Sequence, residues 1–439
     1  MIEEAKIRAI DIFNRAILSV NPFMAVKAQA ETLNSFYRLK NIKRVFVIGF
    51  GKACLEMTKA TNESLGEIID KGIIITKYNH AKGITSIDKI KVFEAAHPIP
   101  DESGVVATKK IIELLKEADE STLVICLISG GGSALLVSPM EPIKLEEKQI
   151  TTKLLLEAGA NINDVNTVRK HISSVKGGRL AKIAYPAYIK SLILSDVIGD
   201  RLDVIASGPT TFDSTTYYDA LGVLKKFKLL DKIPKSVVEI LNRGKNGEIS
   251  ETLKKDDYVL TNTENIIIGS NKIALEAAKK KAIEMGFYTE ILTSEIEGEA
   301  KEVGKWLSDI AKTYKRKKQK KEIEKPICLL SGGETTVTVV GCGKGGRNTE
   351  LALAFAIEIE GIDGIFLLSA GTDGTDGPTD AAGAYATGYT VNKAKRLGLV
   401  PEGHLKNNDS YNFFKKIDGL FFTGPTGTNV MDIQIIFIY

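Results

Sequence analysis

The sequence predicts an α/β protein of two α/β domains, the first of them a Rossmann-like, mostly parallel sheet with helices on both faces. Short apolar runs alternate with segments of helical period, which is typical of a parallel sheet covered on both sides. Many of the 39 glycines cluster directly after these runs, where α/β proteins keep their binding loops. The 439 residues are enough for two or three domains of roughly 100–200 residues each.

The first domain is expected to open with a helix over residues 3–20, because its apolar residues follow helical spacing. Five apolar runs then alternate with helix-period segments, and each run is expected to form a buried strand. These runs cover residues 44–48, 72–76, 92–96, 123–128 and 189–195. A polar, glycine-bearing stretch at 241–248 has no period, so we place a boundary there and assign residues 1–245 to the first domain.

The second domain, residues 246–439, continues the alternation of strands and helices. Its expected strands cover residues 265–268, 288–293, 327–330, 364–368, 420–422 and 432–438. Helical patterns separate them, with the longest at 300–314 and another beginning at Asn348. A β-branched run at 335–340 leads into four glycines just before that second helix.

The composition is ordinary for a soluble globular protein, with 44% hydrophobic and 26% charged residues. A net charge of +4 is too small to indicate a nucleic acid or membrane partner. The four cysteines contain no Cys-x-x-Cys pair, and the N-terminus has no signal-peptide pattern. No apolar run approaches the roughly 18 residues of a membrane span. We therefore expect a cytoplasmic protein, and a homodimer only because dimers are the commonest oligomers.

Lys52 ends the first of four glycine-rich loops, Gly49-Phe-Gly-Lys, which follows a predicted strand. The pattern partly matches a dinucleotide-binding fingerprint. However, Cys54 occupies the third glycine position, and Lys77 stands where an acid should bind the ribose. We interpret Lys52 as a point charge aimed at an anion, with an exposed lysine in a turn as the structural alternative.

Three consecutive glycines form the second loop, after the predicted strand at 123–128. They offer a nest of backbone N–H groups flanked by two hydroxyls, which suits phosphate or carboxylate oxygens. The candidate anion-binding residues are Ser129, Gly130, Gly131, Gly132 and Ser133. A serine nucleophile is the rival interpretation, but the Gly-x-Ser-x-Gly spacing is absent.

Asp196 directly follows the predicted strand at 189–195, at the carboxyl end where α/β proteins place working side chains. Polar and cationic residues also gather between Asn166 and Arg179 in the same region. We interpret Asp196 as functional, and for Asp200 a helix cap is the structural alternative.

The last two loops lie in the second domain. The glycines after residue 340 and the following helix favour an anion site, with a tight strand-to-helix turn as the alternative. Its candidates are Lys344, Gly345, Gly346, Arg347 and Asn348. Farther on, Asp373, Asp376 and Asp380 crowd one loop, which suits Mg²⁺ shared with a nucleotide phosphate. Asx-turns in a tight loop are the structural alternative.

These motifs together resemble the class II glycerate kinases (glycerate 2-kinases), which carry a C-terminal MOFRL-type domain. The matches keep one order over residues 45–432, although Thr349 and Met431 depart from the usual pattern. The matching motifs are Gly49-Phe-Gly-Lys52, Ser129-Gly-Gly-Gly-Ser-Ala-Leu135, Arg169-Lys-His-Ile-Ser-x-x-Lys-Gly-Gly178, Ser195-Asp-Val-x-Gly-Asp200, Ala206-Ser-Gly-Pro-Thr210, Ser331-Gly-Gly-Glu334, Gly345-Gly-Arg-Asn-x-Glu350, Gly371-Thr-Asp-Gly-x-Asp-Gly-Pro-Thr-Asp-Ala-Ala-Gly383 and Thr423-Gly-Pro-Thr-Gly-Thr-Asn-Val430.

The resemblance implies an ATP- and Mg²⁺-dependent kinase that phosphorylates D-glycerate, commonly to 2-phosphoglycerate, in a cleft between the two domains. The family's lysine and arginine fall on Lys52 and Arg347. Our hypothesis is that both close on the glycerate carboxylate and the transferring phosphoryl group. In it, Asp196 orients or deprotonates the attacking hydroxyl, and Asp373 and Asp376 lie near Mg²⁺.

Two other functions stay open at this point. An NAD(P)-dependent hydroxypyruvate reductase would need a proton donor such as His97 or His171, and a nicotinamide site. A non-catalytic sugar-acid-binding protein would bind its ligand without consuming ATP. The sequence does not decide which loop would take ATP and which would take glycerate.

Overall fold

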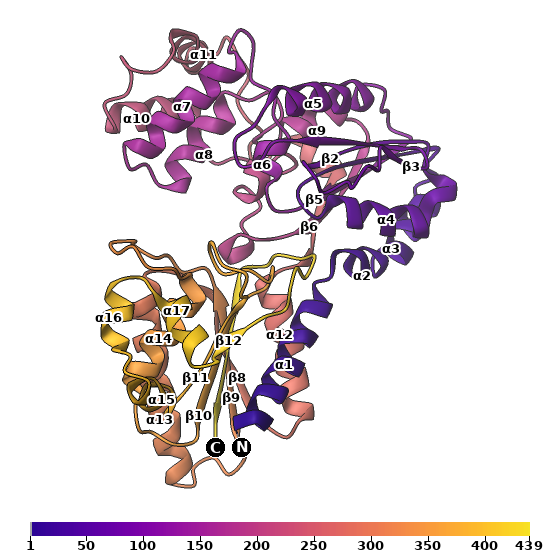
Figure 1. Cartoon of the computed structure of the whole chain (residues 1–439). Coiled ribbons are helices and arrows are strands. Elements are labelled where there is room, and N and C mark those ends of the chain that lie inside the picture. The colour runs from indigo at the N-terminus through magenta and orange to yellow at the C-terminus, as the bar shows by residue number, and fades with distance from the viewer. Residues whose placement is uncertain (1) are drawn as a thin grey trace. The chain divides into compact units, whose positions relative to one another are not determined.

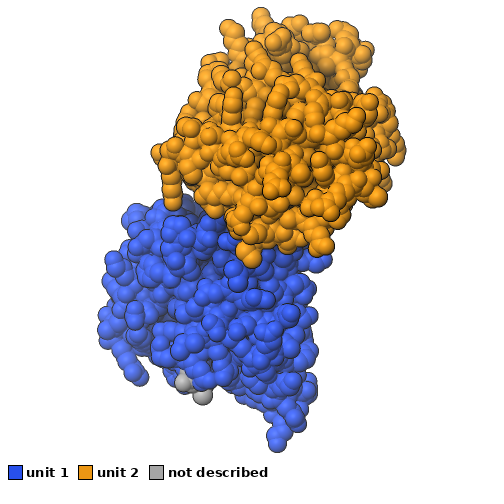
Figure 2. Space-filling view, turned by 90° about the vertical axis from the view of Figure 1, so that its right-hand side faces the viewer, with its two compact units in different colours: residues 1–21, 196–199, 269–439 blue, residues 22–195, 200–268 orange. Residues whose placement is uncertain are grey.

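The computed structural model describes residues 2–439, and the chain divides into two compact units (Figure 2). Unit 1 combines the N-terminal residues up to 21, residues 196–199 and residues 269–439. Unit 2 combines residues 22–195 and 200–268. Each unit is built on its own β-sheet, so the predicted α/β class holds for both.

Unit 2 contains a seven-stranded sheet in the order β3-β4-β2-β1-β5-β6-β7. The pairs of β1 with β2 and β5, of β2 with β4, and of β5 with β6 are parallel, while β3 runs antiparallel to β4. This confirms the mostly parallel sheet. The strands are β1 (Arg44–Phe50), β2 (Lys71–Lys77), β3 (Ser86–Ile87), β4 (Ile90–Ala95), β5 (Thr122–Ile128), β6 (Tyr188–Leu194) and β7 (Thr263–Gly269).

Helices cover both faces of this sheet (Figure 1). On one face lie α2 (Pro22–Lys27), α3 (Ala30–Leu39) and α4 (Cys54–Leu65), and on the other lie α5 (Glu102–Leu115) and α9 (Arg179–Ala184). The chain runs outward from β1 to β2 and β4 and then returns to β5 on the other side of β1. The direction of winding therefore reverses between β1 and β5, and α/β sheets bind ligands at such a switch point.

A group of helices with its own apolar core extends unit 2. It consists of α7 (Leu145–Glu157), α8 (Ile162–His171), α10 (Tyr217–Lys226) and α11 (Lys235–Lys245) (Figure 1). The short helix α6 (Gly132–Leu135) leads into this group from β5. The stretch expected to be a linker at 241–248 is helical up to Lys245, because Val237, Ile240 and Leu241 are fully buried on one face of α11.

Unit 1 contains a six-stranded sheet in the order β12-β11-β10-β13-β9-β8, in which only the β8–β9 pair is parallel. Its strands are β8 (Tyr288–Ile296), β9 (Ile327–Gly333), β10 (Ile365–Gly371), β11 (Gly383–Thr387), β12 (Leu420–Phe421) and β13 (Asp432–Ile438). Helices α1 (Ile2–Ser19) and α12 (Asn271–Glu284) cover one face (Figure 1). The other face carries α13 (Ala300–Gln319), α14 (Arg347–Glu358), α15 (Thr390–Arg396), α16 (Pro401–Lys406) and α17 (Ser410–Lys416).

The compact units differ from the predicted division after residue 245. Residues 246–268 belong to unit 2, because β7 is the edge strand beside β6. The first helix belongs to unit 1, where it packs against α12 and where Phe13 meets Phe421 edge-on with 5.3 Å between ring centroids. The β-branched run at 335–340 forms no strand, since β9 already ends at Gly333 and only Thr336 makes an isolated bridge.

Candidate active site

The loops that follow β1 and β5 lie side by side at the switch point of unit 2. The backbone N–H of Lys52 donates to the carbonyl of Gly130 at 2.9 Å, and the N–H of Ala53 donates to Ser129 Oγ at 3.1 Å. Two loops that the sequence singled out separately therefore form one structure, placed where a parallel sheet binds its ligands.

Gly131 lies at the centre of this structure, with a φ of +82° that favours glycine. A Cβ at this position would stand 2.9 Å from Cδ2 of His97 and 3.4 Å from Cε of Lys52, so both side chains close over it. Within residues 2–439, the backbone N–H groups of Gly130 and Gly131 have no hydrogen-bond acceptor. Two unpaired donors beside the Lys52 side chain have the chemistry of the anion-binding nest predicted for this loop, and anion binding there stays a prediction.

His97, which the site prediction omitted, follows β4 and is surrounded by basic groups. Burial lowers the pKa of His97 to about 4, with further contributions from Lys52, Lys77 and His80. These side chains follow or end β1, β2 and β4, so three neighbouring strand ends carry basic groups. Because His97, like Lys52, comes just after a predicted strand, the same pattern could have identified His97 as a candidate site residue from the sequence. The resulting positive potential favours an anion at Gly131.

Lys176 connects the glycine loop to the turn at Ala206 and Ser207. Its fully buried ammonium donates to the carbonyl of Ser133 at 2.9 Å, to Ser133 Oγ at 3.2 Å and to the carbonyl of Ala206 at 3.3 Å. The hydroxyls of Ser133 and Ser207 are 2.8 Å apart. Ala206 and Ser207 have φ values of +51° and +62°, and such conformations persist only where the surroundings enforce them.

Arg347 opens α14 in unit 1 and is held by two carboxylates. Its Nε and Nη2 donate to Oδ2 and Oδ1 of Asp432 at 2.6 and 2.9 Å, and its Nη1 donates to Glu334. Burial raises the pKa of Asp432 to about 6, although the Arg347 charge acts in the opposite direction. The paired carboxylates fix the orientation of the guanidinium and offset its charge.

The glycine-rich loop before α14 is packed against the turn between α16 and α17. The N–H groups of residues 340–342 donate to the side-chain oxygens of Asn407 and Asn408, and that of Lys344 donates to Asp409 Oδ1. A Cβ on Gly341 or Gly343 would approach the backbone of Asn407 within 2.6 Å. These amides are occupied by the protein itself, so residues 340–344 do not form the predicted nest.

The remaining candidates of this loop are also held internally. Gly346 N donates to Thr349 Oγ1 at 3.0 Å, and the Asn348 amide group bonds to Asp376 and Ser369. A Cβ on Gly345 would stand 2.3 Å from Ser410 Oγ. Close approach of Ser410 on α17 explains the glycine at 345, and close approach of Asp376 explains the glycine at 346, without a ligand.

The two aspartates predicted near Mg²⁺ differ in their environments. Both oxygens of the buried Asp376 accept hydrogen bonds at 2.8 Å from the first turn of α14, at Asn348 N, Thr349 N and Thr349 Oγ1. Asp373 accepts two bonds from Thr375 through Oδ1, as in an Asx-turn. Among the described residues no group of three or more acidic, His or Cys side chains could hold a metal. Asp376 is a helix cap and does not fit a metal ligand, while Asp373 keeps Oδ2 uncommitted.

Asp196 lies just past the end of β6, as predicted, and its side chain is half-buried. The chain passes there from unit 2 into residues 196–199 of unit 1.

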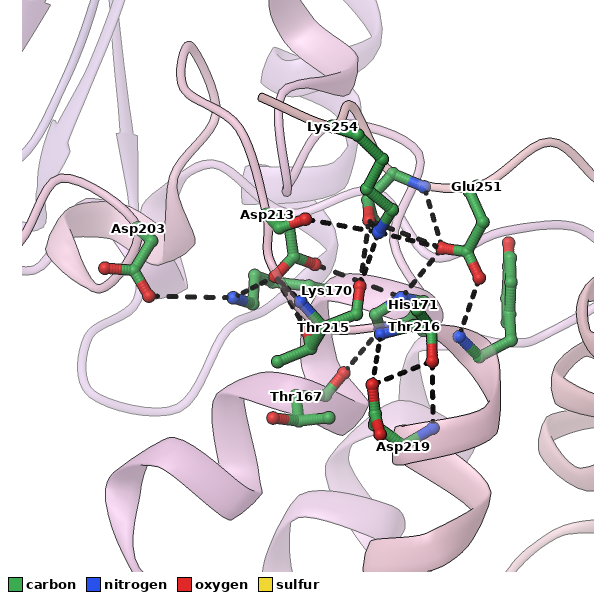
Figure 3. Close-up of polar contacts among 12 residues, drawn as sticks. Thr167, Lys170, His171, Asp203, Asp213, Thr215, Thr216, Asp219, Glu251 and Lys254 are labelled. Carbon is green, nitrogen blue, oxygen red and sulfur yellow. Dashed lines mark hydrogen bonds and ion pairs between the residues drawn. The ribbon is translucent and has the colours of Figure 1, made fainter. Parts of the chain in front are cut away.

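Part of the polar motif on α8 is structural (Figure 3). Lys170 Nζ donates to Asp213 Oδ1 at 2.6 Å, with both side chains buried. His171 lies with Nδ1 2.7 Å from the carbonyl of Thr167 and Nε2 3.2 Å from Glu251 Oε2. Burial raises the pKa of Glu251, but hydrogen bonds from His171 and a backbone N–H outweigh it and lower the pKa to about 2. This network joins α8 to the segments at 213–219 and 251–254.

The fold defines the class of protein: an α/β protein with a glycine-rich loop at the carboxyl ends of its parallel strands, where proteins of this class bind ligands. Two family models match the chain, a domain of unknown function (DUF4147) over residues 8–242 and the MOFRL family over residues 327–432. In the part of the chain that the structure describes, no helix has the length and apolar character to cross a membrane.

Comparison with curated relatives and solved structures identifies the family within this class. The chain is 46% identical to D-glycerate 2-kinase of Thermotoga maritima, covering 99% of this chain and 98% of that protein. It is 45% identical to glycerate 2-kinase of Pyrococcus horikoshii, covering 90% and 87%. The crystal structure of glycerate kinase from Thermotoga maritima matches with a TM-score of 0.89 over the whole of both chains. The chain belongs to the glycerate kinase family with a C-terminal MOFRL domain, which confirms the resemblance seen in the sequence.

Proposed function

We propose that this protein is a glycerate 2-kinase, which transfers the terminal phosphoryl group of ATP to the 2-hydroxyl of D-glycerate. The products are 2-phosphoglycerate and ADP. The observation that carries the proposal is the nest at the switch point, where the unpaired amides of Gly130 and Gly131 lie beside Lys52. The relatives at 45–46% identity that are named for this activity support it.

Phosphoryl transfer requires positioning and charge neutralisation more than a covalent nucleophile. We propose that Lys52 and the nest of residues 129–133 bind phosphoryl oxygens and stabilise the negative charge of the transition state. The neutral imidazole of His97 lies against Gly131 and helps to exclude water from this position.

We also propose roles for the groups in unit 1. Arg347, oriented by Asp432 and Glu334, would bind an anionic oxygen of a substrate through the N–H bonds left free by its carboxylate partners. Asp196 would accept a hydrogen bond from the glycerate 2-hydroxyl and take up its proton. Mg²⁺ would neutralise phosphate charge when it accompanies ATP. Since Asp376 does not fit as a ligand, we derive no step through the ion.

Some relatives carry another label, such as the putative hydroxypyruvate reductase of Agrobacterium vitis, 38% identical over 97% of this chain. The histidine environments do not favour that reaction here. His97 is neutral at pH 7 because its pKa is about 4, and His171 is fully buried in the network on α8. His97 lies at the nest but carries no positive charge to stabilise a bound oxo acid, and His171 is held by the carbonyl of Thr167 and by Glu251. A cytoplasmic location, where ATP is made and used, and a homodimer stay proposals.

The test is an assay of the full-length protein with ATP, Mg²⁺ and D-glycerate, with the product identified by phosphorus NMR. We expect a signal from 2-phosphoglycerate and none from the 3-isomer. Fluorescence titration with NADH should show no saturable binding. Lys52→Ala and Arg347→Ala should each reduce turnover strongly, and near-normal turnover in both variants would refute the assignment of these residues.

A further inference from the structure

Three cations from separate segments of unit 2 gather behind the glycine nest. Lys148 lies on α7, Arg169 lies on α8, and Lys176 follows α8 in the chain. The Lys148 side chain is only 4% exposed, Lys176 is fully buried, and Arg169 is half-buried. We call these residues the cation cluster. Arg169 on α8 reaches the hydroxyl of Thr152 on α7, which lies one helical turn from Lys148. The charges of Lys148 and Arg169 also contribute, after burial, to lowering the pKa of Lys176, which agrees with this closeness.

The cation cluster lacks the carboxylate partners that other buried charges in this unit have. Within the described residues, the Lys148 ammonium has neither a hydrogen bond nor an ion pair, and Arg169 makes one long bond, from Nε to Thr152 Oγ1 at 3.5 Å. By contrast, Lys170, the next residue on α8, is paired with the buried Asp213 at 2.6 Å. The structural cation Lys170 therefore has a carboxylate partner, whereas Lys148 and Arg169 have none among the described residues.

Unpaired buried charges are unfavourable unless a counter-ion arrives. Burial and the Arg169 charge lower the pKa of Lys148 to about 8. The Lys148 side chain is buried along α7, but among the described residues its Nζ is not one of the fully buried polar atoms without a partner, so the ammonium keeps contact with solvent, from which an anion can approach it. The retained charges are explained if an anion binds to them.

The cluster is connected to the nest through Ser133. Lys176 donates to the carbonyl and the hydroxyl of Ser133, which is two residues beyond Gly131. The Ser133 hydroxyl meets Ser207, whose hydroxyl donates to Asn166 on α8 at 3.3 Å. A chain of hydrogen bonds therefore runs from the nest toward the helix that carries Arg169.

We propose that Lys148 and Arg169, with Lys176 behind them, bind the phosphates of a nucleoside di- or triphosphate. This assigns the phosphoryl donor to unit 2, and it rests on the proposed function in taking the ligand to be the donor of that reaction. Two or three positive charges match the several charges of a polyphosphate, whereas a glycerate carboxylate carries only one.

Calorimetric titration of the full-length protein with pyrophosphate, ADP and D-glycerate tests the assignment. We expect Lys148→Met and Arg169→Gln each to weaken pyrophosphate and ADP binding at least tenfold, and to leave D-glycerate binding within twofold of the original protein. Lys153→Met is the matched control, because Lys153 lies on the same helix, 74% exposed, with only a 3.7 Å contact to Glu157. It should change none of the three affinities.

A second measurement separates ligand binding from a structural role. Removal of an unpaired buried charge should leave the melting temperature of Lys148→Met equal to or above that of the original protein. Affinity for ADP should fall between pH 7.5 and 9 as Lys148 loses its proton, and this fall should be smaller in Lys148→Met. The groups that face Lys148 are Arg169 and Lys176, while its neighbour Glu147 bonds to Ser236 on α11 and to the N–H of Lys144.

Each outcome of these measurements either supports the proposal or overturns it. ADP affinity within twofold of the original in both variants would overturn the proposal, and so would a lowered melting temperature with equal loss of all three ligands. Weakened binding of ADP and pyrophosphate alike would support a site for phosphates. If ADP binds and the variants lose it, but ATP and D-glycerate give no product, the site stands and the proposed function fails.

Discussion

Replacing Gly131 by alanine should damage both the stability of unit 2 and its activity. The position has a φ of +82°, which costs an L-residue about 1–2 kcal/mol. The new Cβ would also stand 2.9 Å from Cδ2 of His97, so the ring must shift. Moving a half-buried ring away from its rotamer adds about 0.5–1.5 kcal/mol.

Gly159 offers a matched control, since its φ is +78° and its Cβ would meet nothing within 4 Å. Gly159→Ala should therefore carry the backbone cost alone. At about 2–4 °C per kcal/mol for a unit of this size, Gly131→Ala should melt about 1–6 °C below Gly159→Ala. Displacement of Lys52 and His97 should also reduce kcat/KM about 100-fold relative to the control.

Differential scanning calorimetry and the ATP-dependent glycerate assay measure both effects. Adding His97→Ala to Gly131→Ala removes the ring that the new Cβ meets, so the melting temperature should return to that of Gly159→Ala. If Gly131→Ala keeps kcat/KM within twofold of Gly159→Ala, the nest is not where the reacting group binds.

Three other predictions concern charged groups of unit 2. Lys52→Ala should lower kcat/KM about 100-fold or more in the kinase assay, while Lys59→Ala, which removes an exposed ion pair on α4, should not change it. Asp213→Asn leaves the buried Lys170 with only its 4.0 Å contact to Asp203 and should cost about 3–5 kcal/mol in urea unfolding; a loss under about 1 kcal/mol would show that the pair is not structural. The pKa of Glu251 is lowered to about 2, so its contribution to stability is complete above about pH 4.3 and is lost as the pH falls toward 2. Glu251→Gln should accordingly show a smaller loss of urea midpoint across that interval.

The sequence predicted the parts of the molecule that depend on local pattern. Strand β1 and the loop with Lys52 are adjacent in the chain, as are β5 and Gly131, so apolar runs followed by glycines were sufficient to find both. Their meeting at one switch point follows from the strand order of a parallel sheet, which local pattern indicates only as a class.

Other features depend on contacts between distant residues and could not be read from local pattern. The sequence suggested that the glycines at 341 and 343 form an anion nest. In the structure, glycine is required at both positions because the backbone of Asn407, more than sixty residues away, approaches too closely for a side chain. Arg347 looked like a free cation because Asp432 is remote in the chain. Likewise, Lys148 looks like any helix-surface lysine until the packing of α7 against α8 is known.

The membership of α1 in unit 1 has a consequence for synthesis of the protein. Ribosomes make this helix before any part of unit 2, yet the α12 surface that covers its apolar residues is made only after all of unit 2. The nascent chain can complete unit 2 early, because domains generally fold as units in the order of their synthesis. Helix α1 must wait, and a chaperone that recognises exposed apolar helices has its longest opportunity to bind there.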